Sequence, residues 1–223
     1  AVNVLPKFMK NEGREVVLDA SGGSFATIAE ALSGGLRDGP LDVYLSQGWA
    51  STDGHRDHAR AQQQNYYANG GYAFNQHWNV RLLANAVDSQ TLAPMPELQP
   101  TATNGVLWPD AERFDTRTFL ATLTLDHRYD TTSGYLKAYR NDTTFDLLQE
   151  LDKATGRRYG GGTGGLWSRQ ELALYGLRAR EKVLPWSGGE ILLGADLDLA
   201  QMKNTQRTYS GLSVAGINGG RAE

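Results

Sequence analysis

The sequence predicts an all-β fold: an antiparallel transmembrane β-barrel, to which these residues contribute about nine strands of a larger up-and-down barrel. Three observations lead to this class. Apolar and polar residues alternate along most of the 223-residue chain, every second connection between predicted strands is tight, and the polar positions hold few of the six lysines. Alternation with period two is typical of strands that have one apolar and one polar face.

Each predicted strand carries apolar residues at every second position. In chain order the segments are 15–23, 24–34, 41–50, 65–74, 78–87, 118–129, 134–150, 171–183 and 190–200. The pattern is weakest in 24–34. It is clearest in EILLGADLDLA (190–200), where Leu193, Leu197 and Leu199 alternate with Asp196 and Asp198. An opening segment before residue 13 supplies one further, separate strand.

The predicted connections alternate in length. Tight turns are expected at 34–40, 74–78, 129–134 and 185–189, and longer polar links at 51–61, 91–112, 151–165 and from about 204 onward. Transmembrane β-barrels have this habit, with short periplasmic turns and long outer loops. A soluble sandwich has no reason to keep it so regularly.

The composition of the two faces indicates which one is inside. Aromatic residues lie near the ends of the apolar segments, as in the girdles of a membrane barrel: Trp49, Phe74, Trp78, Phe119 and Tyr129. The opposite face is rich in Asn, Thr, Ser and Gly and poor in the Lys and Glu that coat a solvated surface. Its charged members are expected to face a water-filled or protein-filled lumen: Arg81, Asp126, Arg128, Lys137, Asp196 and Asp198.

Composition also argues against several classes of protein. A formal net charge of -3 without a basic patch argues against a nucleic-acid partner, and the absence of cysteine excludes disulfides and thiolate sites. The start, AVNVLPKFMK, lacks the apolar run of a signal peptide, so any export signal is expected to have been removed or to lie outside these residues. Gly160, Gly162 and Gly165 satisfy GxGxxG without the strand and helix that nucleotide binding needs. Scattered histidines without a nucleophile elbow argue against an enzyme, and no cofactor is expected.

Two stretches then resemble a known family. Ala1, Val2, Asn3, Val4 and Lys7 match the end of the plug domain of TonB-dependent outer-membrane receptors, and Gly23, Ser24 and Phe25 match the first barrel strand, with Ala26 where glycine is common. A later loop, matching through Asp53, Gly54, Arg56, Asp57 and His58, resembles the early barrel of the same family.

The resemblance implies a domain boundary and a function. Residues 1–12 would be the last plug strand and linker, and residues 13–223 the N-terminal part of the barrel. Such receptors lie in the bacterial outer membrane, contact its lipid, and take up a scarce ligand, most often a ferric siderophore or other metal chelate. They perform no bond chemistry, and the TonB energy-transducing complex drives transport.

Ligand contacts are expected in the outer loops. His55, Arg56 and His58 could contact a metal or an anionic ligand, although the simpler interpretation is a polar loop that turns at Asp53 and Gly54. Trp108 lies in the long link 91–114 with Met95, Leu98 and Leu107, where these side chains could touch a ligand or pack on one another. No resident metal site is predicted.

Two other interpretations remain open. A soluble secreted β-protein, such as a carbohydrate-binding sandwich or a propeller-like enzyme, would turn the same leucines inward. A passive porin would share the barrel but lack the plug.

Overall fold

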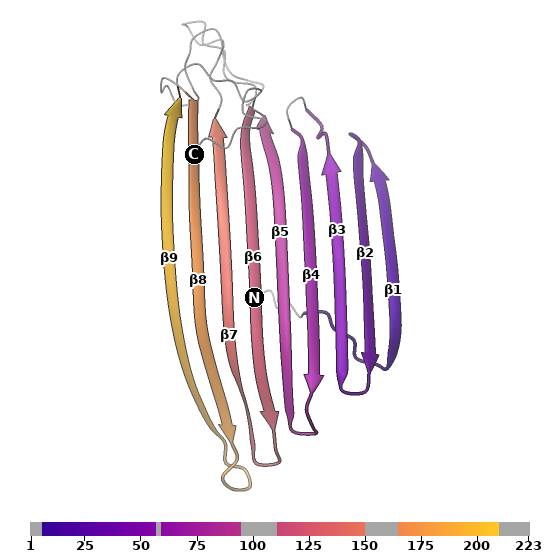
Figure 1. Ribbon diagram of the computed structural model, residues 1–223, viewed down its shortest axis with the longest axis vertical. Coiled ribbons are helices and arrows are strands. Elements are labelled where there is room, and N and C mark those ends of the chain that lie inside the picture. Colours follow the sequence, from indigo (N-terminus) through magenta and orange to yellow (C-terminus); the bar gives the residue numbers. More distant parts are fainter. Residues whose placement is uncertain (1–5, 57–58, 95–110, 150–164, 210–223) are drawn as a thin grey trace, which may run out of the picture.

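The computed structural model describes residues 6–56, 59–94, 111–149 and 165–209, and its strands form a single antiparallel sheet in sequence order (Figure 1). The strands are β1 (Gly13–Gly23), β2 (Thr27–Asp38), β3 (Leu41–Thr52), β4 (Ala61–Ala73), β5 (Trp78–Pro94), β6 (Ala111–Arg128), β7 (Thr132–Gln149), β8 (Gly165–Val183) and β9 (Ile191–Tyr209). The predicted all-β, up-and-down antiparallel class is therefore confirmed. The sheet is open rather than closed, because β1 and β9 do not pair with each other in the part of the chain described.

Several strands are longer than the alternation predicted. β5 runs to Pro94 and β6 begins at Ala111, so both extend into the expected link 91–112. β2 continues to Asp38, through most of the expected turn 34–40. The reason is that backbone pairing continues where the apolar pattern has already ended: Thr91 still pairs with Phe114, and Leu36 with Val43.

The connections alternate in length as expected, with one exception. At one end of the sheet, called the turn end, residues 39–40, 74–77, 129–131 and 184–190 join successive strands. At the opposite end, called the loop end, 53–60 joins β3 to β4, 95–110 joins β5 to β6, and 150–164 joins β7 to β8. The exception is 24–26, a tight turn at the loop end between β1 and β2.

The strands are staggered. Pairing places Leu41, the first residue of β3, in one cross-strand row with Tyr72, Val80, Leu125, Leu136, Ala179 and Ala195. Ala195 lies four residues after Ile191, the start of β9, so the turn end steps downward from β3 to β9 (Figure 1). Such a stagger is what strands require when they tilt around the axis of a barrel.

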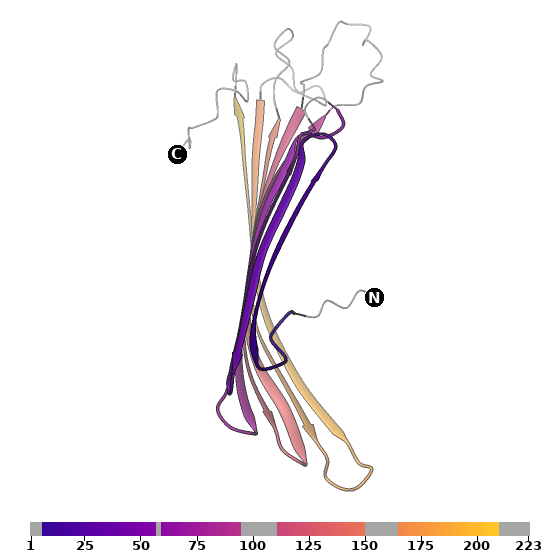
Figure 2. The same ribbon diagram turned by 90° about the vertical axis from the view of Figure 1, so that its right-hand side faces the viewer.

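Few side chains are buried. Among the described residues the buried apolar side chains are Met9, Tyr44 and Leu148, whereas large apolar residues are exposed along every strand. The sheet is bowed, and residues 6–12 lie on its concave side without forming a strand (Figure 2). The part of the opening segment that is described is therefore not a strand, and its place against the sheet explains why burial gathers there.

Candidate functional site

One face of the sheet, called the apolar face, is formed by alternate residues of all strands. Its central leucines lie on β3 and on β5 to β9 and are about half exposed, from 47% to 66%: Leu45, Leu82, Leu123, Leu136, Leu177 and Leu197. The cross-strand register places Leu82, Leu123, Leu177 and Leu197 in one row through Ala138 of β7, and Leu136 lies two residues from that row. Contiguous apolar surface of this extent marks a face that contacts another apolar phase or partner.

Aromatic side chains border the apolar face at the turn end. Trp78 Nε1 donates a hydrogen bond to the Tyr129 hydroxyl (2.9 Å), and the Trp78 ring stacks on His127 with centroids 5.0 Å apart. Tyr72 and Phe74 continue this border on β4 and the turn that follows it. These aromatic rings therefore lie between the apolar face and the polar turns that join the strands.

Aromatic residues followed by ion pairs border the apolar face toward the loop end. Tyr66, Phe119 and Tyr175 are exposed there. Two further residues along the strands the face becomes charged, with Arg117 paired to Asp88 at 3.1 Å. On β7 the same face carries the Arg140–Asp142 pair level with the aromatic residues, since Arg140 pairs with Tyr175 and Asp142 with Phe119.

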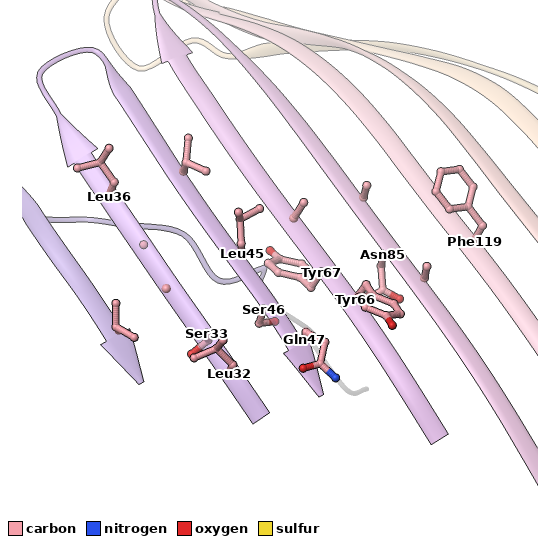
Figure 3. A pocket seen from close by; sticks show the side chains of 17 residues that line it. Leu32, Ser33, Leu36, Leu45, Ser46, Gln47, Tyr66, Tyr67, Asn85 and Phe119 are labelled. Carbon is pink, nitrogen blue, oxygen red and sulfur yellow. The ribbon is translucent and has the colours of Figure 1, made fainter. Parts of the chain in front are cut away.

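A shallow groove of about 890 Å³ lies in the apolar face across β1 to β6 (Figure 3). Its lining includes residues with small side chains, Gly34, Ala68, Ala84 and Ala86, together with the larger Leu45 and Phe119.

The opposite face, called the polar face, has an ion pair at its most buried point. Arg81 of β5 reaches Asp42 of β3 through two bonds, Nη1 to Oδ1 at 2.9 Å and Nη2 to Oδ2 at 2.8 Å. Nη1 also donates to the Asn69 Oδ1 of the intervening strand at 2.9 Å. Asp42 and Asn69 are only 5% and 1% exposed, so every polar atom there needs a partner.

This network holds the N-terminal segment. Because Arg81 occupies the Asn69 Oδ1, the Nδ2 of that amide points to the carbonyl oxygen of Lys7, to which it donates at 2.9 Å. The Tyr67 hydroxyl donates to the same oxygen at 2.8 Å. The guanidinium of Arg81 lies 4.8 Å from the centroid of the Phe8 ring.

The contacts continue on both sides of Phe8. The Lys7 Nζ lies 4.5 Å above the Tyr44 ring and 3.5 Å from the Glu15 carboxylate. A hydrogen bond to Tyr44, with a smaller contribution from Glu15, raises the pKa of Lys7 above its usual value. Arg37 Nη1 donates to the Met9 carbonyl at 3.2 Å. Tyr67, Asn69 and Arg37 thus donate hydrogen bonds to main-chain carbonyls of the segment. Such contacts do not depend on which side chains the bound segment carries.

A second charged cluster lies on the polar face of β7, β8 and β9. Asp196 accepts from Arg178 Nε and from Arg180 Nη2, each at 2.7 Å. Beside it the Tyr139 hydroxyl donates to Asp198. This cluster is exposed, in contrast to the pair around Asp42.

The sequence-predicted residues fall into two groups. The first group lies on the polar face, as the cross-strand register and the alternation of side chains along each strand show: Arg81, Asp126, Arg128, Lys137, Asp196 and Asp198. Asp126 accepts from Asn79 Nδ2 at 2.9 Å. Among the predicted ligand contacts, His55 and Arg56 lie in the β3–β4 connection, and His58 and Trp108 lie outside the described residues.

Sequence reasoning missed Asp42, Asn69 and Tyr67. Each lies in a predicted strand among the polar positions, but only the register between β3, β4 and β5 brings them to Arg81. The signal that could have pointed to Asp42 is its position as an acidic residue at the start of a strand. If such a carboxylate is buried, it needs a positively charged partner such as an arginine nearby.

Neither a family model nor a curated protein matches this chain. Within the described ranges no helix is long and apolar enough to cross a membrane, and no group of three His, Asp or Glu side chains is placed to hold a metal ion.

Proposed function

We propose that this chain is part of a TonB-dependent receptor of a bacterial outer membrane, which takes up a scarce ligand such as a ferric siderophore or other metal chelate. The observation that carries the proposal is the apolar face, whose leucines are exposed on one strand after another. Exposed leucine is costly in water and favourable in hydrocarbon. The polar face then looks into the lumen.

The dimensions of the apolar band support a membrane setting. It runs from Leu41 to Trp49 on β3 and from Ile191 to Leu199 on β9, nine residues on each strand. Nine residues of strand tilted by about 40° rise roughly 22 Å, close to the about 25 Å band of outer-membrane barrels. The band begins at Leu41 on β3 and at Ile191 on β9, the first residues of these staggered strands. It therefore follows the tilt of the strands.

The open edges of β1 and β9 support a larger barrel. An unpaired strand edge leaves backbone N–H and C=O groups without partners, which hydrocarbon does not tolerate. Further strands, beyond the sheet described here, would pair with both edges and close the barrel.

The N-terminal segment supports the receptor over a passive porin. Residues 6–12 already occupy the concave side, bound through the carbonyls of Lys7 and Met9. In a receptor this segment would be the point where the plug domain joins the barrel. The Arg81–Asp42–Asn69 network would then fix that junction to the barrel wall.

The test compares energised and de-energised uptake. Iron-starved cells that produce the protein should accumulate radioactive iron from ferric siderophores, and cells lacking it should not. Uptake should stop when the proton-motive force is dissipated, since TonB depends on it. Uptake that continues without energy would identify a porin. A protein that stays compact in buffer without detergent would identify the soluble alternative and end the proposal.

A further inference from the structure

The β1–β2 turn has an unusual backbone. Thr27 N donates to the Ser24 carbonyl at 3.2 Å, and the two central residues, Phe25 and Ala26, have φ values of 59° and 52°. They are the non-glycine residues with positive φ in the described part of the chain. Positive φ at both central positions defines a type I′ turn, which normally takes Asn-Gly.

Stability does not explain why phenylalanine stands in this turn. A bulky residue at positive φ is a genuine outlier, and strain of this kind gathers at functional sites. The Phe25 side chain is 57% exposed, so burial of its ring contributes little free energy to offset this strain. The turn therefore holds an exposed aromatic ring at a cost in free energy.

Hydrogen bonds tie this turn to the β3–β4 connection. Asp53 N donates to the Phe25 carbonyl at 2.9 Å, and the hydroxyls of Thr27 and Thr52 lie 2.9 Å apart. Gly54 N donates to the Thr52 hydroxyl at 3.1 Å, and Gly54 itself has a φ of 78°. The two connections are thus fixed to each other.

The result is an aromatic pair at the loop end of the sheet. The rings of Phe25 and His55 meet edge to face, with centroids 6.3 Å apart and planes at 72°. Both side chains are exposed. Both rings are therefore presented to solvent side by side on a backbone that is already ordered, which lowers the cost of ordering on binding.

We propose that Phe25 and His55 form a binding site for the planar aromatic part of an iron chelate. The inference rests on the proposed function and names the ligand chemistry that it leaves open. Phe25 would stack on the aromatic plane, a contact that prefers offset or edge-to-face geometry. The His55 imidazole would either hydrogen-bond a polar substituent or coordinate iron that has an open position.

The test uses two probes and the protein purified in detergent. Haemin has an open axial position on iron, whereas ferric tris(2,3-dihydroxybenzoate) has none. Phe25→Asn should weaken the binding of at least one probe about tenfold, as expected for the loss of a stacked ring. The same variant should unfold at higher temperature, because asparagine suits this turn. His55→Gln should remove a haemin Soret shift and leave catecholate binding within about twofold.

Ala26→Gly is the matched control. It relaxes the same turn but keeps the ring, so it should raise the unfolding temperature and leave the affinity of the bound probe unchanged within about twofold. Phe25→Asn with wild-type affinity, or wild-type protein that binds neither probe, overturns the site. If the protein needs detergent and gives either of these results, only the binding site is refuted. If the protein is compact in buffer without detergent, the proposed function is refuted as well.

Discussion

Arg81 and Asp42 form a two-point ion pair across an intervening strand. They lie on β5 and β3, and between them in the same cross-strand row stands Gly71 of β4. A Cβ at Gly71 would overlap both the Asp42 carboxylate and the Arg81 guanidinium. The pair exists because the residue beneath it has no side chain.

Gly71→Ala should therefore destabilise the protein through loss of this pair. Breaking a buried ion pair costs about 3–5 kcal/mol, and partial displacement should cost about 2 kcal/mol or more. Urea unfolding in detergent micelles measures the difference. Gly70→Ala is the control, because the nearest atom to its Cβ is the Asp42 carbonyl oxygen at 3.9 Å. Equal unfolding midpoints for the two variants would contradict the role assigned to Gly71.

Asn69→Ala should release the N-terminal segment from the sheet. The change removes the amide donor to Lys7 and leaves an Arg81 donor without its acceptor, at a cost of about 1–3 kcal/mol. Trypsin should then cleave after Lys7 or Lys10 about tenfold faster, if cleavage follows the population of the released state. Asn79→Ala is the control, because Asn79 lies on the same face but donates to Asp126. Cleavage that accelerates equally in both variants would show that Asn69 does not anchor the segment.

Leu123→Arg should test which face meets hydrocarbon. Arginine on the lipid face near the middle of a bilayer costs about 2–4 kcal/mol in outer-membrane barrels. Thr122→Arg places the same charge one residue away on the polar face and should cost much less. Urea titration of protein folded into phospholipid vesicles measures both. A larger loss for Thr122→Arg would reverse the assignment of the two faces.

The fold was largely predictable because one apolar face imposes a period of two. The limits of β6 were not: Asp115 and Arg117 interrupt the apolar series, so the strand was expected from 118, yet backbone pairing extends it to Ala111. At the site, Arg81 stood out as a lone charge in an apolar strand. Its partner Asp42 did not, because a 39-residue separation is closed only by register across a third strand. The strain at Phe25 comes from its positive φ, and the residues Gly23, Ser24 and Phe25 do not by themselves predict that backbone angle.

The Gly71 arrangement recurs on β8, and comparison of the two predicts an order of costs. Gly176 lies between Tyr139 of β7 and Asp198 of β9 in one cross-strand row, and a Cβ there would overlap both partners. Gly176→Ala should separate the Tyr139 hydroxyl from Asp198. Because this bond is exposed, its loss should cost less than the loss at the buried Asp42.

Unfolding of Gly71→Ala, Gly176→Ala and the double variant under the same conditions checks this order. The two rows lie on distant strands and share no partner, so their costs should add within about 0.5 kcal/mol. A Gly176→Ala cost equal to or above that of Gly71→Ala would mean that burial does not set the strength of these cross-strand contacts.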